Sequence, residues 1–205
     1  MRDELVVVFA RAPERGRVKT RLAASVGDDL ALALYRWLAE RVIGALNAGP
    51  RRWDLRVAAT PAAEAVARWL PEVSDVRPQR GEDLGARMQH ALDEALDEGR
   101  ARVVIVGADC PAVDARRVGE ALDALRGGEG GLGPELDGGY YLIGATRAIP
   151  VFKQVPWGTD AVLERTRQRL RDAAIPWVEL APERDVDRAE DLGVLVGLPG
   201  NFLER

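Results

Sequence analysis

The chain has 205 residues, 47% of them hydrophobic and 30% charged, with a formal net charge of −4, one cysteine and one histidine. This composition is that of an ordinary soluble protein, and it argues against a general nucleic-acid coat, a disulfide-bonded framework and a Cys/His zinc site. No apolar run reaches the roughly 20 residues of a membrane span and the N-terminus does not read as a signal peptide, so we expect a single cytoplasmic domain covering residues 1–205.

The first predicted element is a buried strand, Leu5 to Ala10, followed by a basic loop from Arg11 to Leu22. The loop contains one glycine and five cationic residues: Arg11, Arg15, Gly16, Arg17, Lys19 and Arg21. Loops of this kind cradle phosphates in α/β folds, although the spacing of a P-loop is absent. We interpret the loop as a polyphosphate site, with a merely solvated basic loop as the alternative. Because the loop should be exposed, replacing Lys19 by alanine is expected to cost little stability.

Helix and strand patterns then alternate. A helix is predicted to begin at Asp28 or Asp29, and a strand runs from Leu55 to Ala59. Thr60-Pro61 opens a short helix, with the proline at its first position. Asp75 to Arg77 forms a third strand. Alternation of this kind indicates an α/β domain.

The segment after the third strand, Gln79 to Met88, begins an amphipathic helix. Its glutamine and the backbone around Leu84 and Gly85 could read the edge of a nucleotide base. A plain capped helix start is the alternative.

The fourth predicted strand, Val103 to Val106, is a short β-branched run that ends at Gly107. Asp109 follows its carboxyl end, where ligands bind in open α/β sheets. A carboxylate there suits a hard cation such as Mg²⁺, which commonly bridges carboxylates and substrate phosphates. The alternative role, capping the next helix, is already filled by Asp114. We therefore interpret Asp109 as a metal ligand.

The stretch from Leu132 to Ala145 contains Asp137, Gly138 and Gly139, directly before Tyr140. Asp-Gly is a strong turn signal, so a plain hairpin turn is one interpretation. Glycines beside a carboxylate and tyrosines also let a ligand approach closely, so a loop that binds an acceptor is the other.

The last part of the chain places Trp157 before Thr159, the expected N-cap of a helix. After a final strand, Trp177 to Leu180, comes the acidic segment DVDRAEDL. Its Asp187 is either a second metal carboxylate or the N-cap of a terminal helix.

Four motifs in order, FARAPERGRVKTRLA, GADCPAVD, GPELDGGYYLIG and VPWGT, resemble a bacterial glycosyltransferase-like family named for its association with radical-SAM/selenodomain proteins. That family belongs to the nucleotide-diphospho-sugar transferase (GT-A) superfamily, with molybdenum cofactor guanylyltransferase, phospholactate guanylyltransferase and the Kdo cytidylyltransferase. The resemblance implies an α/β fold, a three-layer α/β/α sandwich with a mixed, mostly parallel sheet. It does not supply a reaction, because the reactions of the family are mostly unassigned.

The resemblance also implies roles for individual positions. Asp109 matches the metal aspartate of the superfamily, and Asp187 matches the aspartate of its terminal motif, although Arg188-Ala189 replace the usual Thr-Pro. The catalytic residues are expected to be Lys19, Arg21 and Asp109, and the metal ligands Asp109 and Asp187. The nucleotide is expected to contact Ala10, Arg11, Arg15, Gly16, Arg17, Lys19, Gln79, Leu84, Gly85 and Asp109. The acceptor is expected to contact Asp137, Gly138, Gly139, Tyr140 and Trp157.

The leading functional hypothesis is nucleotidyl transfer dependent on Mg²⁺ or Mn²⁺, in which an acceptor phosphate or hydroxyl attacks an NTP and pyrophosphate leaves. The basic loop favours it, because a leaving pyrophosphate needs cations. Glycosyl transfer from a nucleotide sugar is the alternative enzyme activity, and a non-catalytic nucleotide-binding regulator is the alternative of another class. The expected partners are a nucleotide and a small-molecule acceptor, with no nucleic acid and no membrane.

Overall fold

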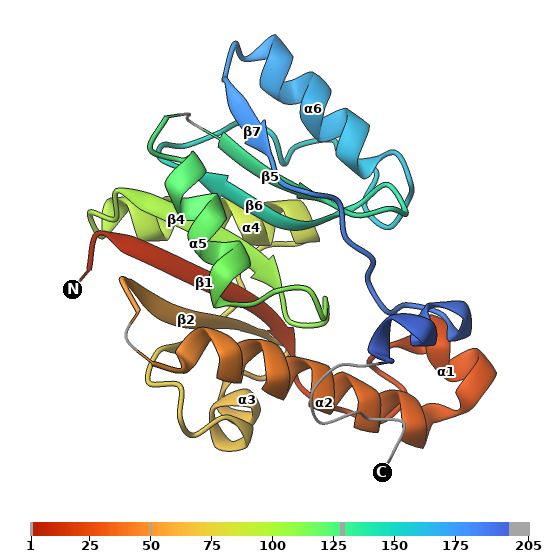
Figure 1. Ribbon diagram of the computed structural model, residues 1–205. Coiled ribbons are helices and arrows are strands. Elements are labelled where there is room, and N and C mark those ends of the chain that lie inside the picture. Colours follow the sequence, from red (N-terminus) through yellow and green to blue (C-terminus); the bar gives the residue numbers. More distant parts are fainter. Residues whose placement is uncertain (1, 50, 128–129, 197–205) are drawn as a thin grey trace.

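The computed structural model describes residues 2–49, 51–127 and 130–196. A seven-stranded sheet with the order β3-β2-β1-β4-β6-β5-β7 forms its centre (Figure 1). The strands are β1 (Glu4–Arg11), β2 (Trp53–Thr60), β3 (Val76–Pro78), β4 (Arg102–Gly107), β5 (Gly130–Pro134), β6 (Tyr140–Ala145) and β7 (Trp177–Glu179). Only β6 runs antiparallel to its neighbours, β4 and β5. The predicted mixed, mostly parallel sheet is therefore confirmed.

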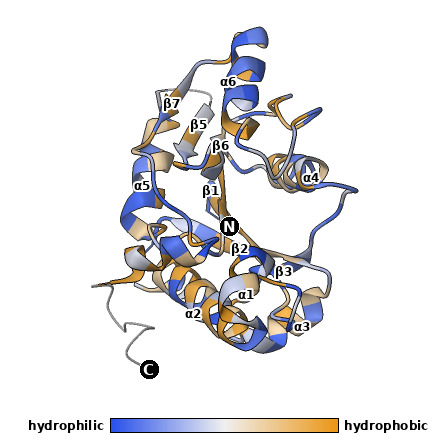
Figure 2. Ribbon diagram, turned by 90° about the vertical axis from the view of Figure 1, so that its right-hand side faces the viewer, coloured by the Kyte–Doolittle hydropathy of each residue, from blue (hydrophilic) through white to orange (hydrophobic). Residues whose placement is uncertain are grey.

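Helices cover both faces of this sheet. They are α1 (Thr20–Val26), α2 (Asp28–Asn47), α3 (Ala63–Trp69), α4 (Leu84–Asp97), α5 (Ala115–Ala124), α6 (Val162–Asp172) and the 3₁₀ helix η1 (Ala189–Leu195). Residues of α2, α3 and α5 pack on one face, and residues of α4 and α6 pack on the other. Figure 2 shows α4 and α5 on opposite sides of the sheet. This is the expected three-layer α/β/α arrangement.

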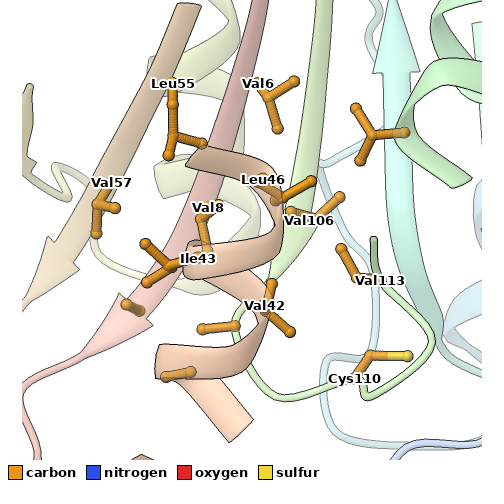
Figure 3. Close-up of a cluster of buried hydrophobic side chains, with 14 of the residues drawn as sticks. Val6, Val8, Val42, Ile43, Leu46, Leu55, Val57, Val106, Cys110 and Val113 are labelled. Atoms are coloured by element: carbon orange, nitrogen blue, oxygen red, sulfur yellow. The ribbon is translucent and has the colours of Figure 1, made fainter. Parts of the chain in front are cut away.

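The central strand β1 explains why the N-terminal run is apolar without alternation. Val6 and Val8 point into the cluster beneath α2, while Leu5 and Val7 point into the cluster beneath α4. All four are fully buried, and Figure 3 shows Val8 beside Ile43 of α2 and Val6 nearer to Leu46 of the same helix. A strand covered on both faces needs apolar residues at every position. Each such side chain contributes about 1.5–3 kcal/mol through burial.

Four local predictions are wrong. The loop after β1 ends earlier than expected, because Thr20 begins α1, whose Leu22 packs against η1. Pro61 lies outside α3, which begins at Ala63 with Ala62 as its N-cap. Ala161, not Thr159, precedes α6 as its N-cap. At the terminal helix the N-cap is Arg188, so Asp187 does not have that role.

The stretch from Leu132 to Ala145 is a β-hairpin over most of its length. Its outer parts belong to β5 and β6, which pair antiparallel, and residues 135–139 connect them. The turn interpretation is therefore correct for the connection. The same connection also lies beside a cleft, as described below, so the two interpretations do not exclude each other.

None of the helices in the described part of the chain combines the length and hydrophobicity needed to cross a bilayer.

Candidate functional site

The site forms where the sheet changes direction. From β1 the chain continues outward to β2 on one side, while β4 pairs with the other side of β1. Phe9 of β1 lies opposite Gly107 of β4, so Arg11 and Asp109 leave neighbouring strands at the same edge. Ligands of open α/β sheets bind in the crevice at such a switch point. A recess of about 260 Å³ lies there, lined by Phe9, Arg11, Val18, Lys19, Thr20, Arg21, Tyr35, Asp109 and Asp187.

Lys19 forms the floor of this recess and is not exposed as predicted. Its side chain is only 2% exposed, and its ammonium lies 2.8 Å from Asp109 Oδ2 and 3.3 Å from Asp185 Oδ1. Its backbone adopts the left-handed conformation (φ 46°, ψ 44°) as the N-cap of α1. For a residue with a Cβ this conformation costs roughly 1–2 kcal/mol. The strained backbone at Lys19 therefore accompanies the contacts of its ammonium with the two carboxylates.

One ammonium shared by two carboxylates makes them titrate differently. Burial disfavours the charge on Lys19, but Asp109 and Asp185 outweigh it and raise the Lys19 pKa. Burial opposes ionisation of Asp109 as well, yet the nearby ammonium holds the pKa of that carboxyl below its usual range. Burial and the charge of Asp109 raise the pKa of Asp185 to about 7. The Lys19 ammonium therefore favours the ionised form of Asp109 more than that of Asp185.

A second ion pair lies at the rim of the recess. Arg21 Nη1 lies 2.9 Å from Asp187 Oδ2, and Arg21 Nη2 donates a hydrogen bond to the carbonyl of Gly158. The side chain of Arg21 is 50% exposed, so it can exchange this partner for a ligand phosphate. Lys19 and Arg21 therefore offer cationic groups at two depths, one buried and one at the surface.

Tyr35 of α2 holds the start of the loop that connects β1 to α1 (residues 12–19). Its hydroxyl accepts a hydrogen bond from the backbone N–H of Arg11 and donates one to the Arg11 carbonyl. Both groups lie at the end of β1, so the tyrosine sets the direction in which the chain leaves the strand. Its burial raises the pKa of the hydroxyl, which stays protonated.

A larger cleft of about 530 Å³ opens beside the recess and shares Phe9, Arg21 and Asp187 with it. Among the residues expected to bind the acceptor, Asp137, Gly139, Tyr140 and Trp157 line it. The rings of Tyr140 and Trp157 meet edge to face, with centroids 6.3 Å apart. Leu84, expected near the nucleotide base, lines this larger cleft as well.

The remaining predicted residues line neither cavity. Arg15 turns away to α2, where it pairs with Asp28 and Asp29, and the neighbouring Arg17 is exposed. Gln79 uses its amide nitrogen to donate to the carbonyls of Ala10 and Ala58. Gly85 and Gly138 are closely packed against neighbouring atoms, whereas Gly16 has a positive φ of 72° and only ordinary contacts. At Gly138, with φ 91°, a Cβ would collide with the backbone of Asp160.

Sequence reasoning missed Asp185 and Glu135. Asp185 is two residues before Asp187, and in an extended segment such residues face the same side. The two contact Lys19 and Arg21 respectively, while Val186 between them is buried. This alternation could have identified Asp185. Glu135 lies at the end of β5 in the wall of the larger cleft, and only the pairing of β5 with β6 brings it there.

The recess contains two carboxylates of the kind that can hold a divalent cation. Asp109 and Asp187 both line it, and Mg²⁺ is usually held by one or two carboxylates together with substrate phosphates. No group of three His, Cys, Asp or Glu residues suited to a metal occurs among the described residues. Both carboxylates are already paired, with Lys19 and Arg21. Phosphate oxygens would give these two cationic side chains new partners and complete the coordination.

Comparison with known proteins supplies the family. The profile of a family described as "Uncharacterized protein conserved in bacteria (DUF2064)" matches residues 45–159. The chain belongs to this family. A proposed nucleotide-diphospho-sugar transferase from Desulfovibrio desulfuricans G20, solved at 1.90 Å, is 35% identical, with a TM-score of 0.90 over 98% of this chain and 90% of that one. No curated protein matches.

More distant structures share the fold of this DUF2064 protein. A nucleotidyl transferase from Methanothermobacter thermautotrophicus is 18% identical, with a TM-score of 0.58 over 92% of this chain and 93% of that one. Rv0371C from Mycobacterium tuberculosis H37Rv, in complex with manganese, is 19% identical, with a TM-score of 0.52 over 95% of this chain and 98% of that one. The fold is therefore shared with nucleotidyltransferases, and one distant relative binds manganese.

Proposed function

We propose that this protein is a nucleotidyltransferase, which transfers a nucleotidyl group from an NTP to a small-molecule acceptor and releases pyrophosphate. The observation that carries the proposal is the recess at the end of β1 and β4. There Lys19 and Arg21 place two cationic groups beside Asp109 and Asp187. Such a set of charges matches a triphosphate with its divalent cation better than it matches an uncharged ligand.

The residues divide the work between binding and positioning. Arg21, at the rim, would leave Asp187 to bind the phosphates that become pyrophosphate. Lys19 is held by Asp109 and Asp185, so its ammonium needs no reorientation from solvent when the phosphates arrive. Asp109 and Asp187 would hold Mg²⁺ or Mn²⁺, which would neutralise phosphate charge and keep the reacting groups in line. Tyr35 keeps the loop between β1 and α1 in place through its two hydrogen bonds with the backbone of Arg11.

Glycosyl transfer is the second candidate, because the relative from Desulfovibrio desulfuricans carries the name of a proposed nucleotide-diphospho-sugar transferase and is 35% identical. In that case the recess would hold the diphosphate of a nucleotide sugar. The larger cleft would hold the sugar and the acceptor.

Product analysis separates the two activities. The protein is incubated with Mg²⁺ and each of the four NTPs or common nucleotide sugars, together with a mixture of small acceptors. Pyrophosphate released from one NTP supports nucleotidyl transfer. Release of a nucleoside diphosphate from a nucleotide sugar identifies a glycosyltransferase instead. If neither product forms while an NTP still binds, the protein is a nucleotide-binding regulator.

A further inference from the structure

The larger cleft carries an unbalanced set of charges. Three arginines line the cleft, and two of them form ion pairs with carboxylates that also line it. Arg21 pairs with Asp187, and Arg184 pairs with Asp191 at 3.3 Å. The third, Arg188, is exposed. Four further acidic residues line the cleft, namely Glu135, Asp137, Asp160 and Glu190. In the part of the chain that the structure describes, none of these four forms an ion pair. The cleft therefore has excess negative charge.

One wall of the cleft is apolar and aromatic. It consists of Leu84 and Met88 from α4 together with Tyr140 and Trp157, and Leu84 is 42% exposed. Aromatic faces next to carboxylates attract organic cations, through the ring quadrupole and through charge. An anionic group would meet the same carboxylates with repulsion. The wall is therefore suited to a ligand that combines an apolar body with a positive charge.

A second metal ion is a poor explanation of the excess charge. A cavity of about 530 Å³ is far larger than an ion, and it lies in the size range of small-molecule sites. Its size therefore suits an organic molecule better than an ion.

We propose that the acceptor is an amine-bearing small molecule with an apolar body, and not a phosphorylated one, bound with its ammonium against Glu135 and Asp137 and its apolar part against Trp157 and Tyr140. This inference rests on the proposed function, because it assigns the larger cleft to the acceptor. It narrows that function, because an acceptor that lacks a phosphate must attack the α-phosphorus of the NTP through a hydroxyl or another neutral nucleophile, which loses its proton as the bond to pyrophosphate breaks.

The state of Glu135 agrees with this assignment. Burial, together with the charges of Asp185, Asp137 and Asp109, raises the pKa of Glu135 to about 9. Glu135 is therefore mainly protonated at neutral pH when no ligand is bound, and the excess negative charge of the cleft comes from its other acidic residues. A cation placed beside Glu135 would lower its pKa and favour the ionised form. Gly139 packs directly against its carboxyl group, so the backbone holds the group close to the cleft.

Three probes that share a phenyl ring test the proposal: 2-phenylethylamine, 2-phenylethanol and phenyl phosphate, which are cationic, neutral and anionic. The readout is the indole N–H resonance of Trp157 in ¹⁵N-labelled protein, assigned with the variant Trp157→Phe. Trp157 lines the cleft and does not line the basic recess, where a phosphate could bind by itself. We expect the amine to shift the signal with an affinity about tenfold higher than that of the alcohol, and phenyl phosphate to bind more weakly than either.

Variants test which residues are responsible. Glu135→Gln combined with Asp137→Asn should reduce the amine affinity about tenfold, towards that of the alcohol. Glu164→Gln, an exposed change on α6 outside both cavities, should leave it unaltered. The proposal is overturned if phenyl phosphate shifts Trp157 at least as tightly as the amine does, if no probe shifts it, or if the double variant binds the amine normally. Binding of Mg²⁺-NTP is measured separately, so its absence would refute the nucleotidyltransferase proposal without affecting the amine result.

Discussion

Lys19 offers the sharpest test of how the recess is held together. Replacing it by methionine keeps the length of the side chain and the backbone strain, but removes the ammonium between Asp109 and Asp185. Breaking a buried ion pair on one side costs roughly 3–5 kcal/mol, because a carboxylate is left uncompensated. The side chain of Asp109 is 36% exposed, so solvent reduces this penalty. We expect a loss of about 3 kcal/mol, or a fall of about 6–12 °C in Tm.

The assay is thermal and urea unfolding without ligand, at about pH 8 and about pH 5. The second lysine of the chain, Lys153, is exposed and provides the matched control, because Lys153→Met should change stability by less than about 0.5 kcal/mol. Without the ammonium, the two carboxylates hold protons more strongly in the folded protein than in the unfolded chain. The stability of Lys19→Met should therefore fall as the pH rises, and its deficit should be larger at the higher pH. Equal Tm values for the two variants at both pH values would refute the reasoning.

Three further predictions concern other parts of the chain. Burial raises the pKa of the Cys110 thiol to about 12, so a thiol reagent at neutral pH should label it only at the rate of unfolding, and rapid labelling of the native protein would contradict its burial. Burial opposes ionisation of Asp54, but its hydrogen bonds, above all the one from Arg100, lower its pKa to about 2. The substitution Asp54→Asn should therefore cost about 1–2 kcal/mol of stability at neutral pH. Urea titrations should show that this cost disappears as the pH falls from about 4 to about 2. Gly138→Ala should destabilise the protein by more than about 2 kcal/mol, because the new Cβ would collide with the backbone. Gly158 also has a positive φ but has open space around it, so Gly158→Ala should cost about 1 kcal/mol. Equal losses of stability in thermal unfolding would show that the collision at position 138 is relieved.

The fold was predictable from the sequence because local patterns and the sheet agree. The continuous apolar run of β1 shows that both faces of the strand are covered. The N-cap Asp114 marks the start of α5, where its carboxylate accepts a hydrogen bond from the backbone N–H of Arg117. The hairpin of β5 and β6 was harder to recognise. Its first strand begins with Gly130 and Gly131, which give no strand signal of their own, and it is defined by pairing with β6 and β7.

The site was predictable in part. Asp109 was predicted from its position after a strand, Lys19 and Arg21 from the basic loop, and Asp187 with the help of the family resemblance. The structure brings all four to one recess, and their roles there stay predictions. Their contacts were not predictable, because Lys19 is buried by a segment 166 residues away, which supplies Asp185. The same loop contains Arg15, which has equal charge and points to α2. Charge and spacing alone do not distinguish side chains that face opposite sides of one loop.

The central claim is that the recess binds a nucleoside triphosphate together with its divalent cation. Calorimetric titration of each NTP and the corresponding NDP, with and without Mg²⁺, tests it most directly, using the intact protein, Asp109→Asn, Arg21→Ala and Arg15→Ala. The account predicts that one NTP binds more tightly than its NDP in the presence of Mg²⁺, and that saturation at about 100 times Kd adds about 2.7 kcal/mol to stability. Asp109→Asn should remove the dependence on Mg²⁺ and Arg21→Ala should weaken binding, while Arg15→Ala should bind normally. Binding that is indifferent to Mg²⁺ and to Asp109→Asn, or equally weakened by Arg15→Ala and Arg21→Ala, would contradict the account.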